Sequence, residues 1–343
     1  MLNTVTLCEA ELESIAKKIA DVRVAVVGDV CLDLYWYADM KRSRLSRETP
    51  HFPLPVVRES YAPGGAGNVM NNVFALGVRE LLPVSLVGDD WRGALLRGWL
   101  RDHYLPQEGI AVSRSRITPC YCKPMRCGIS DVVYEDPRLD FENYEPLSLA
   151  DEAQVLASLD AAAAHADVIA VSDQYRFGAI TPKVRRRLSA LAQQMPVFVD
   201  SRERAAEYTG VIVKPNEVEA ALALGRADAD EPLTDEQYAE IGCELQRKNG
   251  RPVVVTLGAR GALWCDDGGA VLAPTAPAQP PVDIVGAGDT FLAALAAAFA
   301  AGAAGAKALA FANLASGVTV KKIGTTGTAT LAEIREKYRE NQQ

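Results

Sequence analysis

Short apolar runs separated by longer segments of helical periodicity recur along most of this 343-residue chain, and this alternation constrains the fold more than any other feature. The apolar runs are typical of buried strands and cover residues 23–29, 82–87, 168–172, 197–200, 211–213 and 253–257. Helical spacing is found at 11–20, 68–76, 91–102, 150–164, 182–193, 216–224, 234–249, 290–300 and 306–321. Such alternation predicts an α/β protein with a mostly parallel central sheet and helices on both faces. Ligands of such sheets bind beyond the carboxyl ends of the strands, so we expect the functional site there.

Two segments, 31–62 and 113–145, interrupt the alternation. They lack helical periodicity and are rich in β-branched, aromatic and cysteine residues. We expect them to form a small accessory sheet, with its prolines at the edges. Because two distant segments would meet beside the ligand end of the main sheet, this small sheet is expected to act as a lid. We therefore treat 1–343 as a single domain with a lid sub-domain.

Composition and charge exclude several classes of partner. Lys and Arg number 36 against 44 Asp and Glu, which gives a net charge of -8 and argues against a nucleic-acid partner. The longest apolar stretch, 291–301, is too short to span a bilayer, and the first residues carry acid rather than the basic start of a secretory signal. We therefore expect a cytoplasmic protein with no membrane association. The seven cysteines, an odd number at irregular spacings, favour reduced thiols over a disulfide framework.

The strongest local motif is Val282-Asp-Ile-Val-Gly-Ala-Gly-Asp-Thr-Phe-Leu. Gly286, Ala287 and Gly288 precede an apolar helical run, so their backbone N–H groups can converge at a helix N-terminus and hold an oxyanion such as a transferring phosphoryl group. Asp289 lies at the same place and can take a proton from an attacking hydroxyl. The alternative is a glycine-rich turn with Asp289 as a helix cap, and the residues alone leave both interpretations open.

A second group of residues is suited to a polyhydroxylated ligand. Gly64 and Gly65 permit close approach of a ligand to the backbone, and Asn68 offers both a donor and an acceptor to hydroxyls. Asp29 and Asp33 flank the loop after the first strand, where carboxylates can accept hydrogen bonds from sugar hydroxyls. The alternatives are helix capping by Asn68 and a solvated loop for the two aspartates.

A third group is suited to a nucleotide and its metal ion. Asn216 and Glu219 are three residues apart at the expected start of a helix, so they share a face and can order water around Mg²⁺. A capping arrangement of the same two residues is the alternative, and it can coexist with metal binding. Lys214 can reach a nucleotide phosphate or can be an ordinary surface lysine. A further set follows a strand at the ligand end of the sheet: Thr256, Gly258 and Gly261.

Four motifs in one order resemble the signatures of the ribokinase-like (PfkB) carbohydrate kinases, and the resemblance runs from about residue 22 to residue 330. They are Pro63-Gly-Gly-Ala-Gly-Asn, Asn216-Glu-Val-Glu, Thr256-Leu-Gly-Ala-Arg-Gly and Gly286-Ala-Gly-Asp-Thr-Phe. The resemblance implies a ribokinase-like three-layer α/β/α fold and transfer of phosphate from ATP, with Mg²⁺, to a sugar hydroxyl. It implies Asp289 as the base, Gly286–Gly288 as the anion hole and Asp33 as a sugar ligand. It also implies nucleotide contacts at the Thr256 loop and Asn313, and a K⁺ site at the backbone oxygens of Asp283, Val285 and Gly324.

Several segments resemble one branch of this family, the D-glycero-D-manno-heptose 7-phosphate kinases. They are Gly28-Asp-Val-Cys-Leu-Asp-Leu-Tyr-Trp-Tyr, Ser43-Arg-Leu-Ser-Arg-Glu-Thr-Pro, Arg138-Leu-Asp-Phe-Glu and Ser172-Asp-Gln-Tyr-Arg-Phe-Gly. The chain departs from that branch where Arg47 replaces a proline, where Gln174 is inserted and where Arg176 replaces a lysine.

The branch implies a sugar that already carries phosphate, for which Arg44, Arg138 and Arg176 are the candidate cations. The alternative for these three arginines is a solvated basic face. In the branch, a second domain carries a His-x-Gly-His motif; the three histidines here do not form one, and we expect the kinase half alone.

Three rival functions are weighed against the heptose kinase. They are a kinase of an unphosphorylated sugar, a catalytically silent sugar-phosphate-binding member of the family, and an NAD-dependent oxidoreductase. The oxidoreductase is disfavoured because the loop after the first strand lacks Gly-x-Gly-x-x-Gly. Exposed edges of the accessory sheet favour a homodimer.

Overall fold

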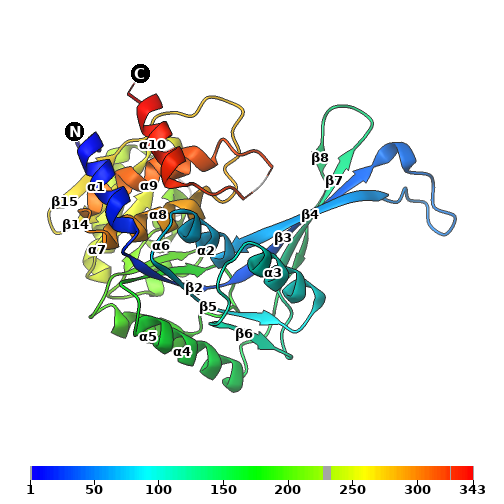
Figure 1. The fold of residues 1–343 in the computed structure, drawn as a ribbon, viewed down its shortest axis with the longest axis horizontal. Helices are drawn as coiled ribbons and strands as arrows, with labels where there is room; N and C mark the ends of the chain where they lie inside the picture. The colour runs from blue at the N-terminus through cyan, green and yellow to red at the C-terminus, as the bar shows by residue number, and fades with distance from the viewer. Residues whose placement is uncertain (1, 227–232, 325, 343) are drawn as a thin grey trace.

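The computed structural model describes residues 2–226, 233–324 and 326–342, and these form three layers with a sheet in the middle (Figure 1). Six strand pairs at the centre of this sheet, from β13 to β6, are parallel, whereas β13–β14 and β14–β15 are antiparallel. The strands, in spatial order, are β1 (Asn3–Thr4), β15 (Gly269–Ala273), β14 (Ala262–Asp266), β13 (Val253–Thr256), β12 (Ile212–Val213), β11 (Val197–Ser201), β10 (Val168–Asp173), β2 (Arg23–Gly28), β5 (Glu80–Gly88) and β6 (Ile110–Ser113). The expected fold class is confirmed.

Helices cover both faces of the central sheet (Figure 1). One face carries α1 (Glu9–Ile19), α2 (Ala66–Ala75), α3 (Trp91–Asp102), α8 (Ala287–Ala300) and α9 (Gly305–Thr319), with α10 (Leu331–Glu340) packed on α9. The other carries α4 (Leu149–Ala163), α5 (Pro182–Leu191), α6 (Glu217–Ala223) and α7 (Asp235–Asn249). The apolar periodicity predicts most of these helices, but it predicts neither α10 nor the β14–β15 hairpin.

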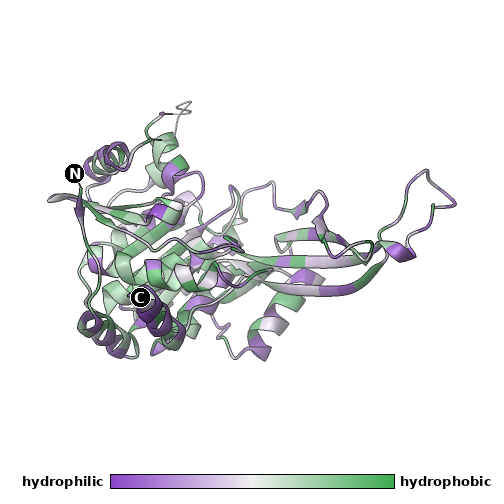
Figure 2. Ribbon diagram, turned by 90° about the horizontal axis from the view of Figure 1, so that it is seen from above, coloured by the Kyte–Doolittle hydropathy of each residue, from purple (hydrophilic) through white to green (hydrophobic). Residues whose placement is uncertain are grey.

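Alternation along the strands divides the apolar residues into two cores. In β11, Phe198 packs in the core beneath α8, whereas its neighbours Val197 and Val199 pack in the core beneath α5. Successive side chains of a strand point to opposite faces, which is why a continuous apolar run is needed in a strand covered on both sides. Figure 2 accordingly shows hydrophobic colouring through the inner strands and hydrophilic colouring on the outer faces of the helices.

A second sheet, which we call the accessory sheet, projects from the body (Figure 1). Its strands are β3 (Val30–Asp39), β4 (Val56–Gly65), β7 (Cys120–Cys127), β8 (Tyr134–Glu135) and β9 (Leu139–Phe141), in the order β4-β3-β7-β8 with β9 also on β7. β3 runs antiparallel to β4 and parallel to β7. Residues from both interrupting segments therefore meet in one small sheet.

One expectation about this sheet is wrong, because Pro124 lies inside the central strand β7 rather than at an edge. β9 pairs with residues 120–122 of β7 and β8 pairs with residues 125–126, so neither strand pairs with Pro124. The carbonyl of Pro124 accepts a hydrogen bond from the Asp136 N–H on that side, at 2.9 Å. The missing proline N–H thus falls between two short strands, where the sheet does not need a donor.

Two general expectations can be compared with the described residues. No helix in the described ranges has both the length and the apolar character needed to cross a membrane. All seven cysteines are free, as expected for reduced thiols.

Candidate active site

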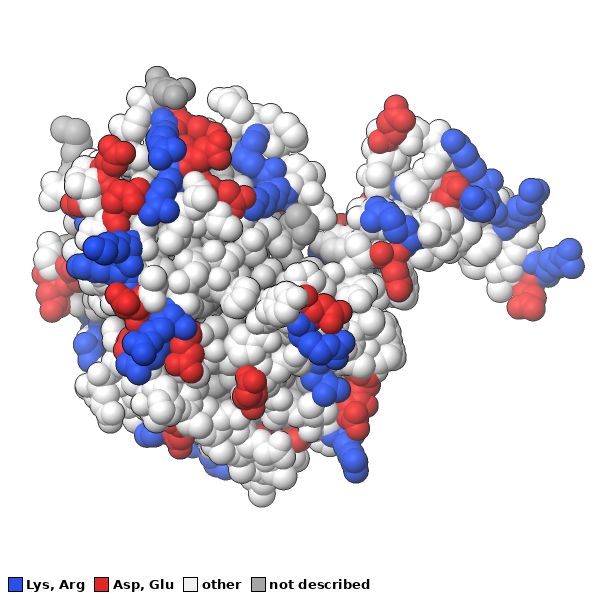
Figure 3. All heavy atoms as spheres, in the orientation of Figure 1, with Lys and Arg blue, Asp and Glu red and all other residues white. Residues whose placement is uncertain are grey.

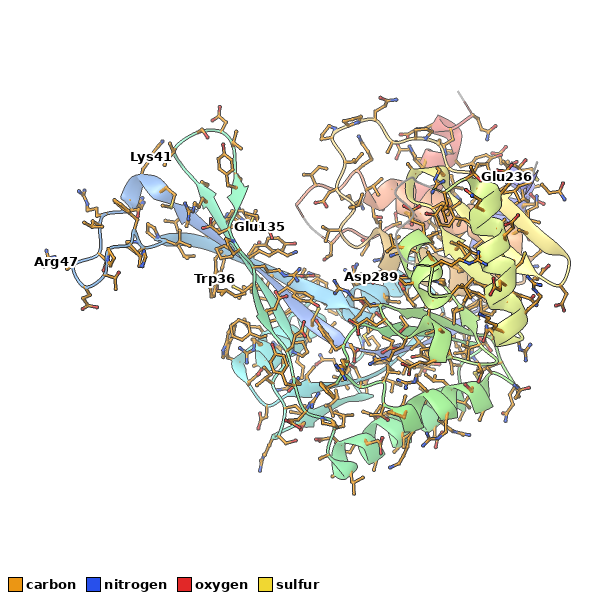
Figure 4. All side chains as sticks on the ribbon, turned by 180° about the vertical axis from the view of Figure 1, so that it is seen from behind. Trp36, Lys41, Arg47, Glu135, Glu236 and Asp289 are labelled. Atoms are coloured by element: carbon orange, nitrogen blue, oxygen red, sulfur yellow. The ribbon has the colours of Figure 1, made fainter. Side chains whose placement is uncertain are left out.

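A cavity of about 670 Å³ opens at the carboxyl ends of β11, β12 and β13, beside the N-terminus of α8. Asp200 at the end of β11, Lys214 just after β12 and Thr256 at the end of β13 line it together with Gly288. The carboxyl ends of parallel strands leave loops and helix N-termini on one side of a sheet, and this is where the cavity lies. Figure 4 shows Asp289 within the body, near the inner end of the accessory sheet.

Asp289 lies in the first turn of α8, in the wall of this cavity. The Asn68 amide of α2 donates a hydrogen bond to its Oδ2 at 2.9 Å. The pKa of Asp289 is raised to about 7, chiefly by burial and also by the nearby carboxylate of Asp200, while Asn68 and the Lys214 ammonium oppose the rise. A carboxyl group with a pKa near neutrality is well matched to taking up a proton during a reaction.

The backbone around Gly286 differs in one respect from the expected anion hole. Gly286 has a φ of 77°, a left-handed conformation, and a Cβ there would lie 2.6 Å from the Asn68 Nδ2 atom. The Ala287 N–H donates to the Ile284 carbonyl at 3.1 Å and is therefore not available to a ligand. In the described part of the chain, the N–H groups of Gly286 and Gly288 have no acceptor, so two of the three expected donors remain available to a ligand.

The residues expected to bind a sugar lie where β3, β4 and α2 meet. Asn68 is buried at the start of α2, which begins directly after Gly64 and Gly65. A Cβ at Gly64 would lie 2.6 Å from Oδ2 of Asp33, so this position has room only for glycine while Asp33 keeps its rotamer. Asp33 is not among the residues that line the cavity, but its charge is close enough to raise the pKa of Asp289.

Lys123 is a charged residue beside Asp33 that sequence reasoning missed. Its Nζ lies 3.6 Å from Oδ1 of Asp33, and both side chains are about nine-tenths buried. The only signal in the sequence was a lysine between apolar residues in a predicted strand. That pattern does not reveal which neighbouring strand the lysine faces.

Asp29 does not face the cavity, contrary to the expectation that it binds sugar. Its carboxylate accepts hydrogen bonds from three backbone N–H groups: Gln174 at 2.9 Å, Tyr175 at 2.9 Å and Ala179 at 2.6 Å. Gly178 packs so closely on the carboxylate that a side chain there would clash. Asp29 therefore joins the end of β2 to the loop after β10, and its hydrogen-bonding capacity is used within the protein.

In the wall of the cavity, Lys214 is buried and forms an ion pair with Asp200, with 3.0 Å between Nζ and Oδ2. Burial lowers the pKa of Lys214, but Asp200 and Glu219 raise it by more, so the lysine remains a cation. Asp200 is a second residue that we did not single out, although it ends one of the predicted strand runs. Lys214 is therefore not the surface lysine that its residue type alone would suggest.

Asn216 and Glu219 form the reciprocal capping arrangement considered above. Asn216 Oδ1 accepts from the Glu219 N–H at 2.8 Å, and Glu219 Oε2 accepts from the Asn216 N–H at 2.8 Å. This leaves Oε1 of Glu219 free of the capping bonds. Burial, with the nearby Asp200, raises the pKa of Glu219. The remaining nucleotide candidates also line the cavity: Thr256, Gly258, Gly261 and Asn313.

The carboxylates around Lys214 fit a hydrated divalent cation better than a directly bound one. Among the described residues, no cluster of three His, Cys, Asp or Glu side chains is arranged to hold a metal ion directly. Nevertheless, the charges of Asp200, Glu219 and Asp289 all act on Lys214, and the charge of Asp200 also raises the pKa values of Glu219 and Asp289. A Cβ at Gly288 would lie 3.9 Å from Asp200 Oδ2, so a carboxylate borders the expected anion hole. Mg²⁺, which prefers oxygen ligands and retains water, would relieve this excess of negative charge.

The residues of the expected K⁺ site are brought together by one side chain. Oδ1 of Asp283 accepts from the Val285 N–H at 3.0 Å, and Oδ2 accepts from the Gly324 N–H at 2.8 Å. The backbone oxygens of these residues therefore belong to neighbouring turns beside the anion hole.

The three candidate arginines lie in different places. Arg44 is exposed in the segment between β3 and β4, at the outer end of the accessory sheet, where Figure 3 shows basic side chains gathered. Arg176 is exposed, with its guanidinium carbon 5.4 Å from the ring centre of Phe177. Arg138 stacks on Tyr121 at 4.1 Å and lowers the pKa of Asp33. Only Arg138 of the three thus acts on the expected sugar site.

Comparisons with known proteins show the family of this chain. A family model described as "pfkB family carbohydrate kinase" matches residues 22–331. The chain is 35% identical over 337 residues to the "Bifunctional protein HldE" of Caulobacter vibrioides, covering 94% of this chain and 65% of that protein. It is 33% identical over 328 residues to the protein of the same name in Geobacter metallireducens, covering 94% and 64%. The chain thus spans slightly less than two thirds of the length of these curated relatives.

Solved structures share the fold at low sequence identity. Ribokinase of Arabidopsis thaliana, complexed with ribose and ATP, superposes with a TM-score of 0.68 at 20% identity, covering 92% of this chain and 98% of that one. Phosphofructokinase-2 of Escherichia coli, in complex with fructose-6-phosphate, superposes with a TM-score of 0.70 at 19% identity, covering 94% and 100%.

Proposed function

Because this chain belongs to the pfkB family of carbohydrate kinases and is therefore a sugar kinase, we propose that it transfers the γ-phosphoryl group of ATP to a hydroxyl of a sugar or sugar phosphate, with Asp289 as the base. The observation that carries the proposal is the position of Asp289. It borders the cavity, its pKa is raised towards neutrality, and Asn68 connects it to the Gly64–Asp33 region. One carboxylate thus borders the cavity that we assign to the nucleotide and is held by Asn68, which we assign to the acceptor.

The reaction follows from the groups at this junction. The acceptor oxygen forms a bond to the γ-phosphorus, the bond between that phosphorus and the oxygen bridging to the β-phosphate breaks, and ADP leaves. The hydroxyl proton passes to Asp289, whose orientation is held by Asn68. The free N–H groups of Gly286 and Gly288 stabilise the charge on the equatorial oxygens of the transferring group.

The residues of the cavity have separate roles towards the nucleotide. Lys214 offers a buried positive charge to the phosphates, while Asp200 keeps it ionised and oriented. Asp200 and Glu219 would hold Mg²⁺ through water, and that ion supplies neutralisation of the triphosphate charge. Thr256, Gly258 and Gly261 bind the phosphates, and Asn313 lies further along the nucleotide. A K⁺ ion at Asp283, Val285 and Gly324 belongs to the same proposal.

The acceptor that we propose is D-glycero-D-manno-heptose 7-phosphate, because the segments at Gly28, Ser43, Arg138 and Ser172 resemble kinases of that sugar. Arg138 is the cation best suited to its phosphate, since Tyr121 supports it beside Asp33. We further propose that the accessory sheet acts as a lid, which covers the bound acceptor and excludes water that would otherwise compete as an acceptor.

The test is ATP consumption with Mg²⁺ across a panel of free and phosphorylated sugars, with the product identified by mass spectrometry. We expect turnover with a phosphorylated heptose, and loss of turnover in Asp289→Asn. Turnover with an unphosphorylated sugar alone would contradict the proposed acceptor. Sugar-dependent thermal stabilisation without any ATP consumption would contradict the kinase proposal and favour a binding protein.

A further inference from the structure

Lys123 is a buried cation whose hydrogen bonds are only partly used. It lies on β7, directly opposite Tyr35 of β3, and donates to the Tyr35 hydroxyl at 2.9 Å. Its Nζ is 3.6 Å from Asp33 Oδ1, which is longer than a hydrogen bond but within reach of a strong charge–charge interaction. An ammonium group has three donors, and among the described residues only Tyr35 accepts a hydrogen bond from this one.

Burial makes this loose pair important for Asp33. The side chains of Lys123 and Asp33 are 10% and 9% exposed, so water screens their attraction weakly. Burial raises the pKa of Asp33, whereas Lys123 and then Arg138 lower it, and the net effect is a rise. Burial lowers the pKa of Lys123, but Asp33 and Tyr35 raise it by more. Each residue therefore helps to keep the other charged.

We infer that Lys123 is a positioning residue for phosphoryl transfer: it holds Asp33 as an oriented carboxylate that accepts hydrogen bonds from the acceptor sugar. The inference rests on the proposed function, because it requires that Asp33 binds the acceptor. Lys123 is not among the residues that line the cavity bordered by Asp289. Its loss should therefore change acceptor binding much more than ATP binding.

The charged and titratable groups around Asp33 come from four segments of the chain: β3, β7, the residue just before β9, and α8. On β3 itself are Cys31 and Tyr35, whose pKa values Asp33 raises. The others are Cys120, Tyr121 and Lys123 on β7, Arg138 just before β9, and Asp289 on α8. Of these, only Lys123 and Arg138 are cations. Arg138 is more exposed and is shared with Asp140, to which it donates at 2.6 and 2.7 Å. Lys123 is thus the main buried counter-charge.

The experiment compares Lys123→Met with Lys123→Arg and with a distant control, Lys183→Met, in steady-state kinetics from pH 5.5 to 9. Lys183 also pairs with a carboxylate, Glu152, but on the outer helices and with a half-exposed side chain. We expect Lys123→Met to raise the acceptor KM by about tenfold or more, the loss typical of weakening a hydrogen bond to a charged group. The KM for ATP should stay within about twofold, Lys123→Arg should restore most of the acceptor affinity, and Lys183→Met should resemble the wild type.

The pH profile separates positioning from simple packing. Without its counter-charge, Asp33 takes up a proton at higher pH, so the rise in acceptor KM on acidification should begin at higher pH in Lys123→Met than in the wild type. In an Asp33→Asn background, Lys123→Met should add less than about twofold to the acceptor KM, because the carboxylate on which it acts is gone. If Lys123→Met does not fold, Lys123→Gln makes the same comparison.

The outcomes distinguish this inference from the proposed function. If the wild-type protein consumes ATP with none of the sugars in the panel, the proposed function is contradicted and the premise of the inference is removed. A wild-type kinase whose Lys123→Met variant keeps its acceptor KM overturns the inference alone. The inference is also overturned by a KM increase that is equal at every pH and persists in the Asp33→Asn background, since that result indicates a packing defect.

Discussion

Replacing Asp289 by asparagine should make the protein inactive and, at alkaline pH, more stable. The pKa of this carboxyl group rises from an ordinary value of 3.8 to about 7 in the folded protein, chiefly because of burial. The folded protein therefore binds a proton between these two pH values that the unfolded chain has already lost. The stability associated with this proton is fully present below pH 3.8 and is lost as the pH rises to about 7.

The size of the effect follows from the same shift. At about 1.4 kcal/mol for each tenfold change in proton affinity, a rise from 3.8 to about 7 corresponds to about 4 kcal/mol at pH 8, as an order of magnitude. At pH 5, the raised pKa of Asp289 has lowered the free energy of unfolding by only about 1–2 kcal/mol. Asparagine has the same shape, stays neutral, and its amide oxygen can accept the hydrogen bond from Asn68. The variant should therefore gain stability over the wild type, and the gain should grow by about 3 kcal/mol between pH 5 and pH 8.

Urea denaturation of both proteins at several pH values measures this difference, and subtracting the two curves removes every other titrating group. Asp131→Asn, at an exposed position in the accessory sheet region, is a matched control that should show a flat difference. In parallel, turnover by Asp289→Asn should fall by about 10²–10⁴-fold while ATP binding is retained. Wild-type kcat should rise with pH through about 7, because the base must be unprotonated.

Two results would refute the reasoning. A stability difference that does not change with pH would mean that burial does not destabilise the ionised form of Asp289. Turnover within tenfold of the wild type would mean that Asp289 is not the base.

Three further substitutions test separate parts of the site. Gly286→Ala should abolish most activity and lower the free energy of unfolding, measured by urea denaturation, by about 1–3 kcal/mol, because φ is 77° at this position and the new Cβ would clash with Asn68. The control is Gly225→Ala, where φ is 67° and no atom lies within 4 Å of the new Cβ; it should lower the free energy of unfolding by about 1 kcal/mol and leave activity unchanged. Asp29→Asn should lower the free energy of unfolding by about 1–3 kcal/mol near pH 4, because one backbone donor loses its acceptor, with little effect on the acceptor KM. This loss should shrink as the pH rises to about 6, because burial raises the pKa of Asp29 to about 6 and asparagine carries no charge to bury. A large KM effect with unchanged stability would restore Asp29 as a sugar ligand. Glu219→Gln can keep the helix cap but loses the negative charge. The Mg²⁺ concentration for half-maximal activity should therefore rise about tenfold, while the melting temperature stays unchanged. An unchanged Mg²⁺ requirement would exclude Glu219 from metal binding.

Local features of the chain were sufficient for much of this protein. A continuous apolar run predicts a strand buried on both faces, so the parallel centre of the sheet, from β2 to β13, was predicted with small errors at the ends. Gly286 and Asp289 are only three residues apart in sequence, so a helix start bordered by glycines was predictable from residue types alone. The capping pair Asn216–Glu219 is equally local, and both of its expected hydrogen bonds are present.

Tertiary structure decided which distant groups meet. Asn68 reaches Asp289 across 221 residues of sequence, and Asp29 is occupied by backbone donors about 150 residues away. Lys123 faces Asp33 only because β7 pairs in parallel with β3, a register that no short motif encodes. Pairing between distant strands is selected by the packing of the whole molecule, whereas residue patterns report only a segment's own preference for helix, strand or turn. Local sequence preference thus predicted the helices and strands, but the partners of each charged side chain were determined by the packing of the whole folded chain.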